Sequence, residues 1–537
     1  MSFLLRSSRK ILSIFFLLSL WSSSIWAANR YVATTGTDAA NDCSNIGSPC
    51  LTLQWAINQS TAGDTINVAD GTYSVTGLVT VTKSLTFKGN QAGVDARTRT
   101  MLPESILSNT QGISVAADNV TFDGFTIQDS SVSVFTGYGI WINPGKNGTQ
   151  IINNIFQNNI AGLGLSNGGA SQCLVQHNLF KDNNLAGGAF GTGIYTDQYV
   201  SGAVSNVLIN ENTFENNDNA GIGFASDDIT RPDSNITISN NTINNCGRGM
   251  YLLNTQSSMI ANNTITNLTA PTDGGNSVAL GIYGGVSDLM VKDNNFETGI
   301  KYGIRIATLI PGSPAPANSA IEIHMNNIFG FAVAGMQVDA APSSLSTFAT
   351  CNWWGSDTGP TNETLNPSGT GDVVAGDLIS ANFNPWLLGP APDGSCGMPP
   401  TVSKSFSPST IYRGDSSTVT ITLTNPNTSP AVLMDPFVDT LPRALKIIGK
   451  PKTTCDGTVS ADKNTSTVTL ADGTIPANGS CTITVKITSC IKGTFTNIIP
   501  VGALQTDMGS NQTLASAVLN VLCNFATQEA IDACYPY

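Results

Sequence analysis

Residues 138–142 read YGIWI, and this pattern of a glycine, an aliphatic residue, a variable residue and usually another apolar residue occurs eight times before residue 339. The copies read YGIWI, AGLGL, TGIYT, AGIGF, RGMYL, LGIYG, YGIRI and AGMQV, and their glycines are Gly139, Gly162, Gly193, Gly221, Gly249, Gly281, Gly303 and Gly335. Successive glycines lie 22 to 32 residues apart. A repeat of this length, made of short alternating strands, predicts a solenoid, because each unit buries its apolar face only by stacking on its neighbours.

A turn containing asparagine precedes most copies. The residues at this place are Asn154, Asn178, Asn212, Asn241, Asn263, Asn295 and Asn327. Asparagine tolerates the left-handed backbone that such corners need, and stacked asparagines can hydrogen-bond along the axis. A sandwich would instead show two-residue turns between antiparallel strands. We therefore expect an all-β, single-stranded, right-handed parallel β-helix of about ten coils, stacked about 4.8 Å apart.

Composition and the N-terminal segment indicate an exported protein. Residues 1–27 have a basic start, an apolar core and a small cleavage position at Ala27 or Ala28, as in a secretory signal peptide. We expect an extracellular, cell-surface or periplasmic location, with no integral membrane span. The net charge is −13 and only 11% of residues are charged. Such an acidic chain is a poor candidate for binding nucleic acid or anionic lipid.

The remaining chain divides by composition. We expect an N-terminal cap at 28–60, the β-helix at 61–388, a linker rich in proline and glycine at 389–400, a β-sandwich at 401–523 and a tail at 524–537. Eleven cysteines in an exported chain predict disulfides. Cys43 and Cys50 enclose a short loop. Cys351 with Cys396 and Cys490 with Cys523 are further candidate pairs, and Cys523 with Cys534 is an alternative, whereas Cys173 and Cys246 have no obvious partner.

Two parts of the sequence resemble known families. YVATTGTDAANDC through GDTINVADGTYSV (residues 31–75) and CNWWGSDTGP (Cys351–Pro360) resemble secreted pectate-lyase-like right-handed parallel β-helix proteins. Residues 406–427, 440–447 and 474–488 resemble an Ig-like repeat of bacterial surface proteins. The first resemblance implies the β-helix fold over residues 29–390, in a class of lyases, hydrolases, epimerases, adhesins and binding proteins. The second implies an Ig-like spacer or contact domain for a protein partner, with a disulfide between Cys455 and Cys481.

One column of outward-facing residues is a candidate binding site. If the aliphatic residue after each glycine points inward, the next residue points outward. The resulting column contains Trp141, Tyr195, Tyr251 and Tyr283. Aromatic rings every second coil would lie roughly 9–10 Å apart, and a sugar ring packs well on an aromatic face. These four residues are the predicted binding track for a polysaccharide or surface glycan. The alternative is an aromatic ladder that only stabilises the outer face.

Candidate catalytic residues near this column are Asp197, Asp227, Asp228, Arg248 and Arg305, with Asn143, Arg231 and Asp339 close by. Lyases resembling this chain often use Ca²⁺ and a basic residue, whereas hydrolases need paired carboxylates. The acidic segment SDDITRPDS, with Asp227, Asp228 and Asp233, is the candidate Ca²⁺ site. A structural zinc site is not expected, because the chain has no CxxC motif and only two histidines. The Gly-His-Gly of polygalacturonases and the Asp-Pro-His of mannuronan epimerases are absent. His177 and His324 are expected to be structural.

The sequence thus favours an exported protein that binds polysaccharide or a surface partner without catalysis. The alternative is a polysaccharide lyase or glycoside hydrolase acting in the β-helix groove. An enzyme needs polar groups that converge in one groove, whereas a binding protein needs only the aromatic column.

Overall fold

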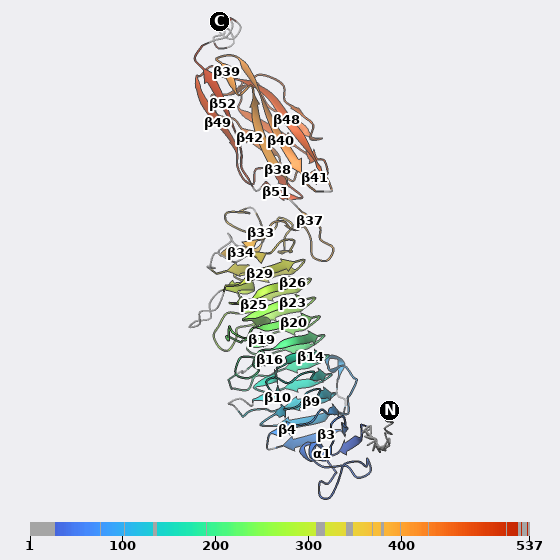
Figure 1. Cartoon of the computed structure of the whole chain (residues 1–537). Coiled ribbons are helices and arrows are strands. Elements are labelled where there is room, and N and C mark those ends of the chain that lie inside the picture. Colours follow the sequence, from blue (N-terminus) through green and yellow to red (C-terminus); the bar gives the residue numbers. More distant parts are fainter. Residues whose placement is uncertain are drawn as a thin grey trace, which may run out of the picture.

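The computed structural model describes residues 27–524, with gaps at 76, 101–102, 133–136, 189–190, 308–316, 340–346, 368, 377–380, 398, 428 and 512, together with Gln528 and Cys534. The signal peptide expected at 1–27 therefore lies almost entirely outside the described residues. The molecule is elongated (Figure 1): stacked parallel coils form a rod, and a second β domain follows at its C-terminal end.

Three parallel sheets form the sides of the rod, and each coil contributes up to one strand to each sheet. Sheet 1 contains β1 (Asn29–Val32), β2 (Thr65–Val68), β5 (Thr86–Lys88), β8 (Thr121–Asp123), β11 (Gln150–Ile152), β14 (Gly168–Gln176), β17 (Ser205–Asn210), β20 (Asp233–Ser239), β23 (Thr255–Ala261), β26 (Ser287–Lys292), β29 (Ser319–His324), β32 (Thr347–Phe348) and β35 (Ala381–Asn382).

Sheet 2 contains the glycine motifs. Its strands are β4 (Val79–Val81), β7 (Ile113–Val115), β10 (Tyr138–Ile142), β13 (Ala161–Gly164), β16 (Thr192–Thr196), β19 (Ala220–Phe224), β22 (Met250–Leu252), β25 (Val278–Tyr283), β28 (Tyr302–Ala307), β31 (Ala334–Val338), β34 (Gly371–Gly376) and β33 (Pro360–Thr361). Sheet 3 contains β3 (Gly71–Val75), β6 (Ser105–Asn109), β9 (Phe125–Gln128), β12 (Ile155–Gln157), β15 (Leu179–Lys181), β18 (Thr213–Glu215), β21 (Thr242–Asn244), β24 (Thr264–Leu268), β27 (Asn295–Gly299) and β30 (Asn327–Phe331). The predicted parallel β-helix is confirmed.

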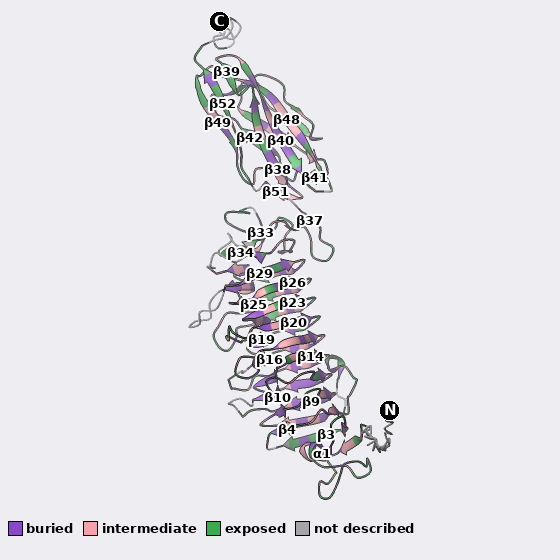
Figure 2. Ribbon diagram, in the orientation of Figure 1, coloured by how far each residue is buried: buried purple, intermediate pink, exposed green. Residues whose placement is uncertain are grey.

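Identical side chains stack inside the rod because successive coils are paired in register. Phe156, Phe180 and Phe214 lie at one position of three neighbouring coils. Their rings stack nearly parallel, with centroids 4.7 and 4.9 Å apart. All three side chains are fully buried, and Figure 2 shows the strands of the rod to be largely buried. Such burial of apolar surface is the dominant stabilising term of a solenoid.

An asparagine ladder runs along the corner between sheets 1 and 3. Its members are Asn154, Asn178, Asn212, Asn241, Asn263, Asn294, Asn326 and Asn352. From Asn178 onward, each Oδ1 atom accepts the backbone N–H of the ladder asparagine in the preceding coil, at 2.9–3.0 Å. Each side-chain nitrogen donates to a carbonyl oxygen of the preceding coil, as Asn212 Nδ2 does to Val175 at 2.9 Å. The ladder therefore supplies hydrogen-bond partners for backbone N–H and C=O groups that would otherwise be buried without them.

The predicted ladder was wrong in two details. Its later members are Asn294 and Asn326, not Asn295 and Asn327, which instead belong to strands of sheet 3. The left-handed backbone belongs to the residue before each ladder asparagine, for example His177 (φ 56°) before Asn178. At each corner, one residue adopts the left-handed backbone and the next residue makes the ladder hydrogen bonds. The sequence pattern NN does not show which asparagine does which.

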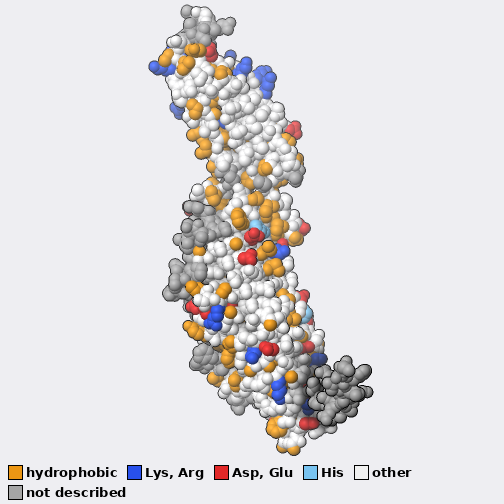
Figure 3. Space-filling model, viewed as in Figure 1, with side chains coloured by type: hydrophobic (Ala, Val, Ile, Leu, Met, Phe, Trp, Pro, Cys, Tyr) orange, Lys and Arg blue, Asp and Glu red, His pale blue; other side chains and the backbone are white. Residues whose placement is uncertain are grey.

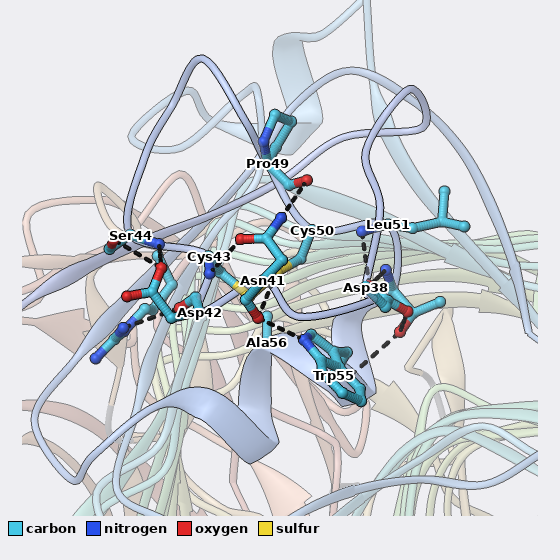
Figure 4. The surroundings of a disulfide bond; sticks show 12 residues. Asp38, Asn41, Asp42, Cys43, Ser44, Pro49, Cys50, Leu51, Trp55 and Ala56 are labelled. Carbon is cyan, nitrogen blue, oxygen red and sulfur yellow. Dashed lines mark hydrogen bonds between the residues drawn. A yellow bond between two sulfur atoms is a disulfide. The ribbon is translucent and has the colours of Figure 1, made fainter.

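The N-terminal end of the rod is covered by α1 (Leu53–Gln59) and the loop closed by the Cys43–Cys50 disulfide. Asn41 organises this loop (Figure 4): its Nδ2 donates to the carbonyls of Thr37, Ser48 and Pro49, and its Oδ1 accepts the N–H of Cys43. The indole of Trp55 donates to the Asn41 carbonyl at 2.7 Å, which ties the helix to the loop. A covered end protects the first coil from pairing with another chain.

The C-terminal domain is built of short antiparallel sheets around its own apolar core, and among its described strands only β39 and β52 pair in parallel. Two short strands precede it, β36 (Trp386–Leu387) and β37 (Cys396–Gly397). Its strands are β38 (Thr401–Ser407), β39 (Thr410–Tyr412), β40 (Ser416–Asn425), β41 (Ala431–Val432), β42 (Phe437–Thr440), β43 (Lys446–Ile447), β44 (Lys452–Thr453), β45 (Thr458–Ser460), β46 (Thr467–Ala471), β47 (Thr474–Ile475), β48 (Gly479–Thr488), β49 (Gly493–Ile499), β50 (Gln505–Thr506), β51 (Gly509–Ser510) and β52 (Ala515–Leu522). The Ig-like assignment and the exact domain boundaries stay predictions.

The disulfides agree with the sequence analysis except at the C-terminus. Cys43–Cys50, Cys351–Cys396 and Cys455–Cys481 form as expected. Cys490 pairs with Cys534, so both pairings suggested for Cys523 were wrong. Cys523 lies exposed just after β52, whereas Cys173 and Cys246 are free and buried. Among the residues described, no helix is long and apolar enough to cross a membrane.

Candidate functional site

The outer face of sheet 2 carries the predicted aromatic column. Strand pairing places Trp141, Gly164, Tyr195, Gly223, Tyr251, Gly281 and Arg305 at one position of successive coils. Aromatic residues thus alternate with glycines, and each aromatic side chain is half-buried. The face in Figure 3 shows charged side chains scattered among a mostly neutral surface, as the low charge content requires.

Tyr283 does not belong to this column, contrary to the sequence alignment. Gly281, not Tyr283, pairs with Tyr251, and Tyr283 pairs with Ala307. The glycine of LGIYG is therefore two residues out of step with the other motif glycines. Tyr283 still faces outward, because a shift of two residues keeps a side chain on the same face of a strand. Its ring lies back over Gly281, where an added Cβ would be 2.5 Å from the ring.

Trp141 and Tyr195 lie beneath the loop that joins β16 to β17. The indole of Trp141 donates to the Val200 carbonyl at 2.9 Å, and both rings pack against the buried cluster of Tyr138, Ala161 and Val200. Asp197 holds this loop closed: its Oδ1 accepts the N–H groups of Tyr199 and Val200, and its Oδ2 accepts the Tyr195 hydroxyl at 3.0 Å. Asp197, a predicted catalytic candidate, is thereby committed to three hydrogen bonds within the loop.

Tyr251 and Tyr283 form the part of the aromatic surface outside this loop, next to two arginines. The phenol end of Tyr251 lies over Gly223, at 2.5 Å from the position of an added Cβ. Glycine at this position leaves room for the tyrosine, and both tyrosines keep an intermediate exposure. Burial raises the pKa of both Tyr251 and Tyr283, so both hydroxyls stay protonated and can donate hydrogen bonds at neutral pH.

The two arginines are fixed by carboxylates and carbonyls. Arg248 donates to Asp273 at 2.8 Å and to the Asn276 carbonyl at 3.1 Å, and it also contacts Asn219. Its guanidinium carbon lies 6.0 Å from the Tyr251 ring centroid. Despite its burial, the pKa of Asp273 lies below its ordinary value, because it accepts hydrogen bonds from Arg248 and the Gly275 N–H. Asp273 is therefore ionised at neutral pH.

Arg305 has the same arrangement two coils further along. It donates to Asp339 Oδ2 from two nitrogens, at 3.0 and 2.6 Å, and lies 5.6 Å from the Tyr302 ring centroid. The structure thus gathers Tyr251, Tyr283, Arg248 and Arg305 on one face, with Asp273 and Asp339 as counter-ions. The sequence analysis missed Asp273, which lies in the loop before β25. A carboxylate next to Gly-Gly in an otherwise neutral loop was the available signal.

The acidic segment 226–234 does not form one site. Asp228 folds the loop on itself by accepting from the N–H and hydroxyl of Thr230 and from Arg231. Asp233 is fully buried at the start of β20, where its Oδ1 accepts the Val204 N–H at 2.8 Å. Within the described ranges, no group of three or more His, Cys, Asp or Glu side chains is arranged to hold a metal ion. The donors of the predicted Ca²⁺ site therefore point to different partners.

Comparisons with known proteins agree with this architecture. Residues 77–230 and 205–344 match the family model of a right handed beta helix region, and residues 400–521 match a domain of unknown function. A search of curated proteins finds no match. Among solved structures, a Dettilon tailspike protein is 12% identical, with a TM-score of 0.42 over 86% of this chain and 94% of that chain. An alginate lyase from Paenibacillus is 14% identical, with a TM-score of 0.38 over 53% and 92%. A pectate lyase, Pel9A, is 11% identical, with a TM-score of 0.34 over 67% and 79%. The fold and the family-model match identify this chain as a right-handed parallel β-helix protein.

Proposed function

We propose that this protein is exported and binds polysaccharide, without cleaving it, on the surface of Tyr251, Tyr283, Arg248 and Arg305. The observation that carries the proposal is the arrangement of the two tyrosines, whose rings lie against glycines and stay partly exposed, so that they can stack on sugar rings. Arg305, which is partly exposed, adds a fixed hydrogen-bond donor beside these rings, and the buried Arg248 holds this part of the surface in place through Asp273 and Asn276. The four disulfides of the structure are consistent with an extracellular protein.

The charges on this surface favour binding over hydrolysis. A glycosidase needs one carboxyl group that is protonated before the bond breaks. Asp273 is ionised, Asp339 accepts two hydrogen bonds from Arg305, and Asp197 is committed to its own loop. Both arginines, which are the candidate bases of a lyase, are themselves held in ion pairs. The surface therefore offers recognition groups, whereas its acid and base candidates are engaged elsewhere.

Affinity electrophoresis of the mature protein through gels that each contain one polysaccharide tests this proposal. One glycan should retard the protein, and Tyr251→Ala and Tyr283→Ala should each weaken binding about tenfold or more, as loss of an aromatic contact residue does. The Phe variants, which keep the rings, should retain most of the affinity. Tyr412→Ala, an exposed tyrosine of the C-terminal domain, is the matched control.

Two results would count against the proposal. Unchanged affinity in both alanine variants, with folding verified by circular dichroism, would remove this surface as the binding site. Release of shortened oligosaccharides or of unsaturated sugar ends would instead support the lyase or hydrolase alternative.

A further inference from the structure

Three strands of the C-terminal domain each place one polar side chain in the apolar core. They are Lys404 on β38, Asp439 on β42 and Asn497 on β49 (Figure 1). The inward neighbours of Lys404 along its strand are apolar, Val402 and Phe406. A lysine at such a position is unusual, because long charged side chains are almost never fully buried.

Asp439 contacts both of the other side chains. The Lys404 Nζ contacts Asp439 Oδ2, and Asn497 Nδ2 donates to both Asp439 oxygens at 3.0 Å. The side chains of Lys404 and Asp439 are 0% exposed, and Asn497 as a whole is 2% exposed. One carboxyl oxygen, Oδ2, therefore lies within hydrogen-bond reach of both the lysine amine and the asparagine amide nitrogen.

Burial changes the chemistry of this group. It lowers the pKa of Lys404 and raises the pKa of Asp439, because charges are poorly solvated in the core. Both shifts favour a proton transfer that leaves a neutral amine beside a neutral carboxylic acid. A neutral, desolvated lysine amine is a nucleophile, and a carboxylic acid can donate and accept a proton.

We propose that Lys404 and Asn497 join in an intramolecular isopeptide bond, with Asp439 as the proton-transfer group. The Lys404 Nζ attacks the side-chain carbonyl carbon, Cγ, of Asn497. The Nζ–Cγ bond forms and the Cγ–Nδ2 bond breaks. Asp439 takes one proton from Nζ and gives one to Nδ2, which leaves as ammonia. The step is redox-neutral and needs no cofactor, so the folded domain contains every reactant.

The position of Asp439 selects this bond over a direct Lys404–Asp439 bond. If Asp439 were the acyl group, another acid would have to assist its loss of water, and Asn497 cannot serve because its amide does not titrate. As the shared partner of amine and amide, Asp439 instead contacts both the nucleophile and the leaving nitrogen. The bond would join β38 at the start of the domain to β49 near its end.

Mass spectrometry of the full mature chain tests the proposal. After reduction of the disulfides and determination of the N-terminus, the intact mass should be lower than the sequence mass by one ammonia, about 17 Da. A tryptic digest should contain one branched peptide that joins the segments around Lys404 and Asn497, with no cleavage after Lys404. Asn497→Ala and Asp439→Ala should each restore the full sequence mass. Lys452→Met, at an exposed lysine of β44, should keep the loss.

The wild-type measurement decides the matter even if the core variants fail to fold. Folded wild-type protein with its full sequence mass and no branched peptide would overturn the proposal. A loss of one water, about 18 Da, with a branch between Lys404 and Asp439 would also overturn it, because Asp439 would then be the acyl group.

Discussion

Replacing Asp233 with asparagine should stabilise the protein at neutral pH. Asp233 occupies the same register position as Asn318, since Ser234 and Ser319 are aligned through β20, β23, β26 and β29. Each accepts a backbone N–H of the preceding coil, Asp233 from Val204 and Asn318 from Val286. Asn318 also donates from Nδ2 to a carbonyl at 2.9 Å, whereas Asp233 Oδ2 is buried without a hydrogen-bond partner. An asparagine at 233 can keep the oxygen that accepts the Val204 N–H while removing the buried charge.

The size of the effect follows from the raised pKa of Asp233. Burial raises this pKa from 3.8 to about 7. Well below pH 3.8 both the folded and the unfolded chain carry the proton, and the carboxyl group costs nothing. As the pH rises, the unfolded chain ionises first, so the free energy of unfolding falls until the folded group also ionises near pH 7. About three pKa units, at about 1.36 kcal/mol each, amount to about 4 kcal/mol at pH 8.

Urea unfolding followed by tryptophan fluorescence at pH 4, 6 and 8 measures this difference. Asp233→Asn should exceed the wild type by less than about 1 kcal/mol at pH 4, where the unfolded carboxyl group is only partly ionised, and by increasing amounts up to pH 8. Asp228→Asn in the same loop is the control with the opposite sign, because hydrogen bonds from Thr230 and Arg231 lower the pKa of Asp228. A gain for Asp233→Asn that is equal at pH 4 and pH 8 would refute the reasoning.

Two further predictions concern the core of the rod. Asn212→Ala should destabilise the protein by about 2–5 kcal/mol, because it leaves the Asn178 N–H and the Val175 carbonyl buried without partners; urea unfolding measures this, and Asn58→Ala on the exposed side of α1 should change little. Titration with a thiol reagent should detect one thiol in the folded protein, the exposed Cys523, and three after unfolding; two or more in the native state would contradict the disulfide pattern. The two buried thiols, whose pKa burial raises to about 12, should stay unreactive until the rod opens.

The fold was readable from the sequence because the solenoid repeats one local pattern. Period-two strands and corner asparagines recur often enough to identify parallel coils, although the pattern NN did not say which asparagine enters the ladder. The alignment failed at Tyr283 because the glycine of LGIYG, Gly281, pairs with Tyr251. The motif in this coil is therefore shifted by two residues relative to the motif in the preceding coil. The pairing register of neighbouring strands is fixed by contacts between coils, and a single sequence motif does not determine those contacts.

The candidate binding surface was predictable only in outline. Trp141, Tyr195 and Tyr251 were placed correctly in one column, but the loop of Asp197 that covers two of them depends on contacts between a turn and a neighbouring coil. The pairing of Arg248 with Asp273 joins residues 25 positions apart in separate loops. The buried lysine of the C-terminal domain was missed because its strand reads as ordinary period-two sequence, and only the assembled core reveals its partners.

The asparagine ladder also affects how this protein can vary in evolution. Successive ladder residues are separated by 22 to 34 positions in sequence, yet the bonds from a backbone N–H to the next Oδ1 are all 2.9–3.0 Å long. Extra residues are therefore accommodated in loops outside the ladder, such as the loop that covers Trp141. Mutation can lengthen or exchange such loops, and with them the recognition properties of the rod, while the hydrogen-bonded interior stays constant.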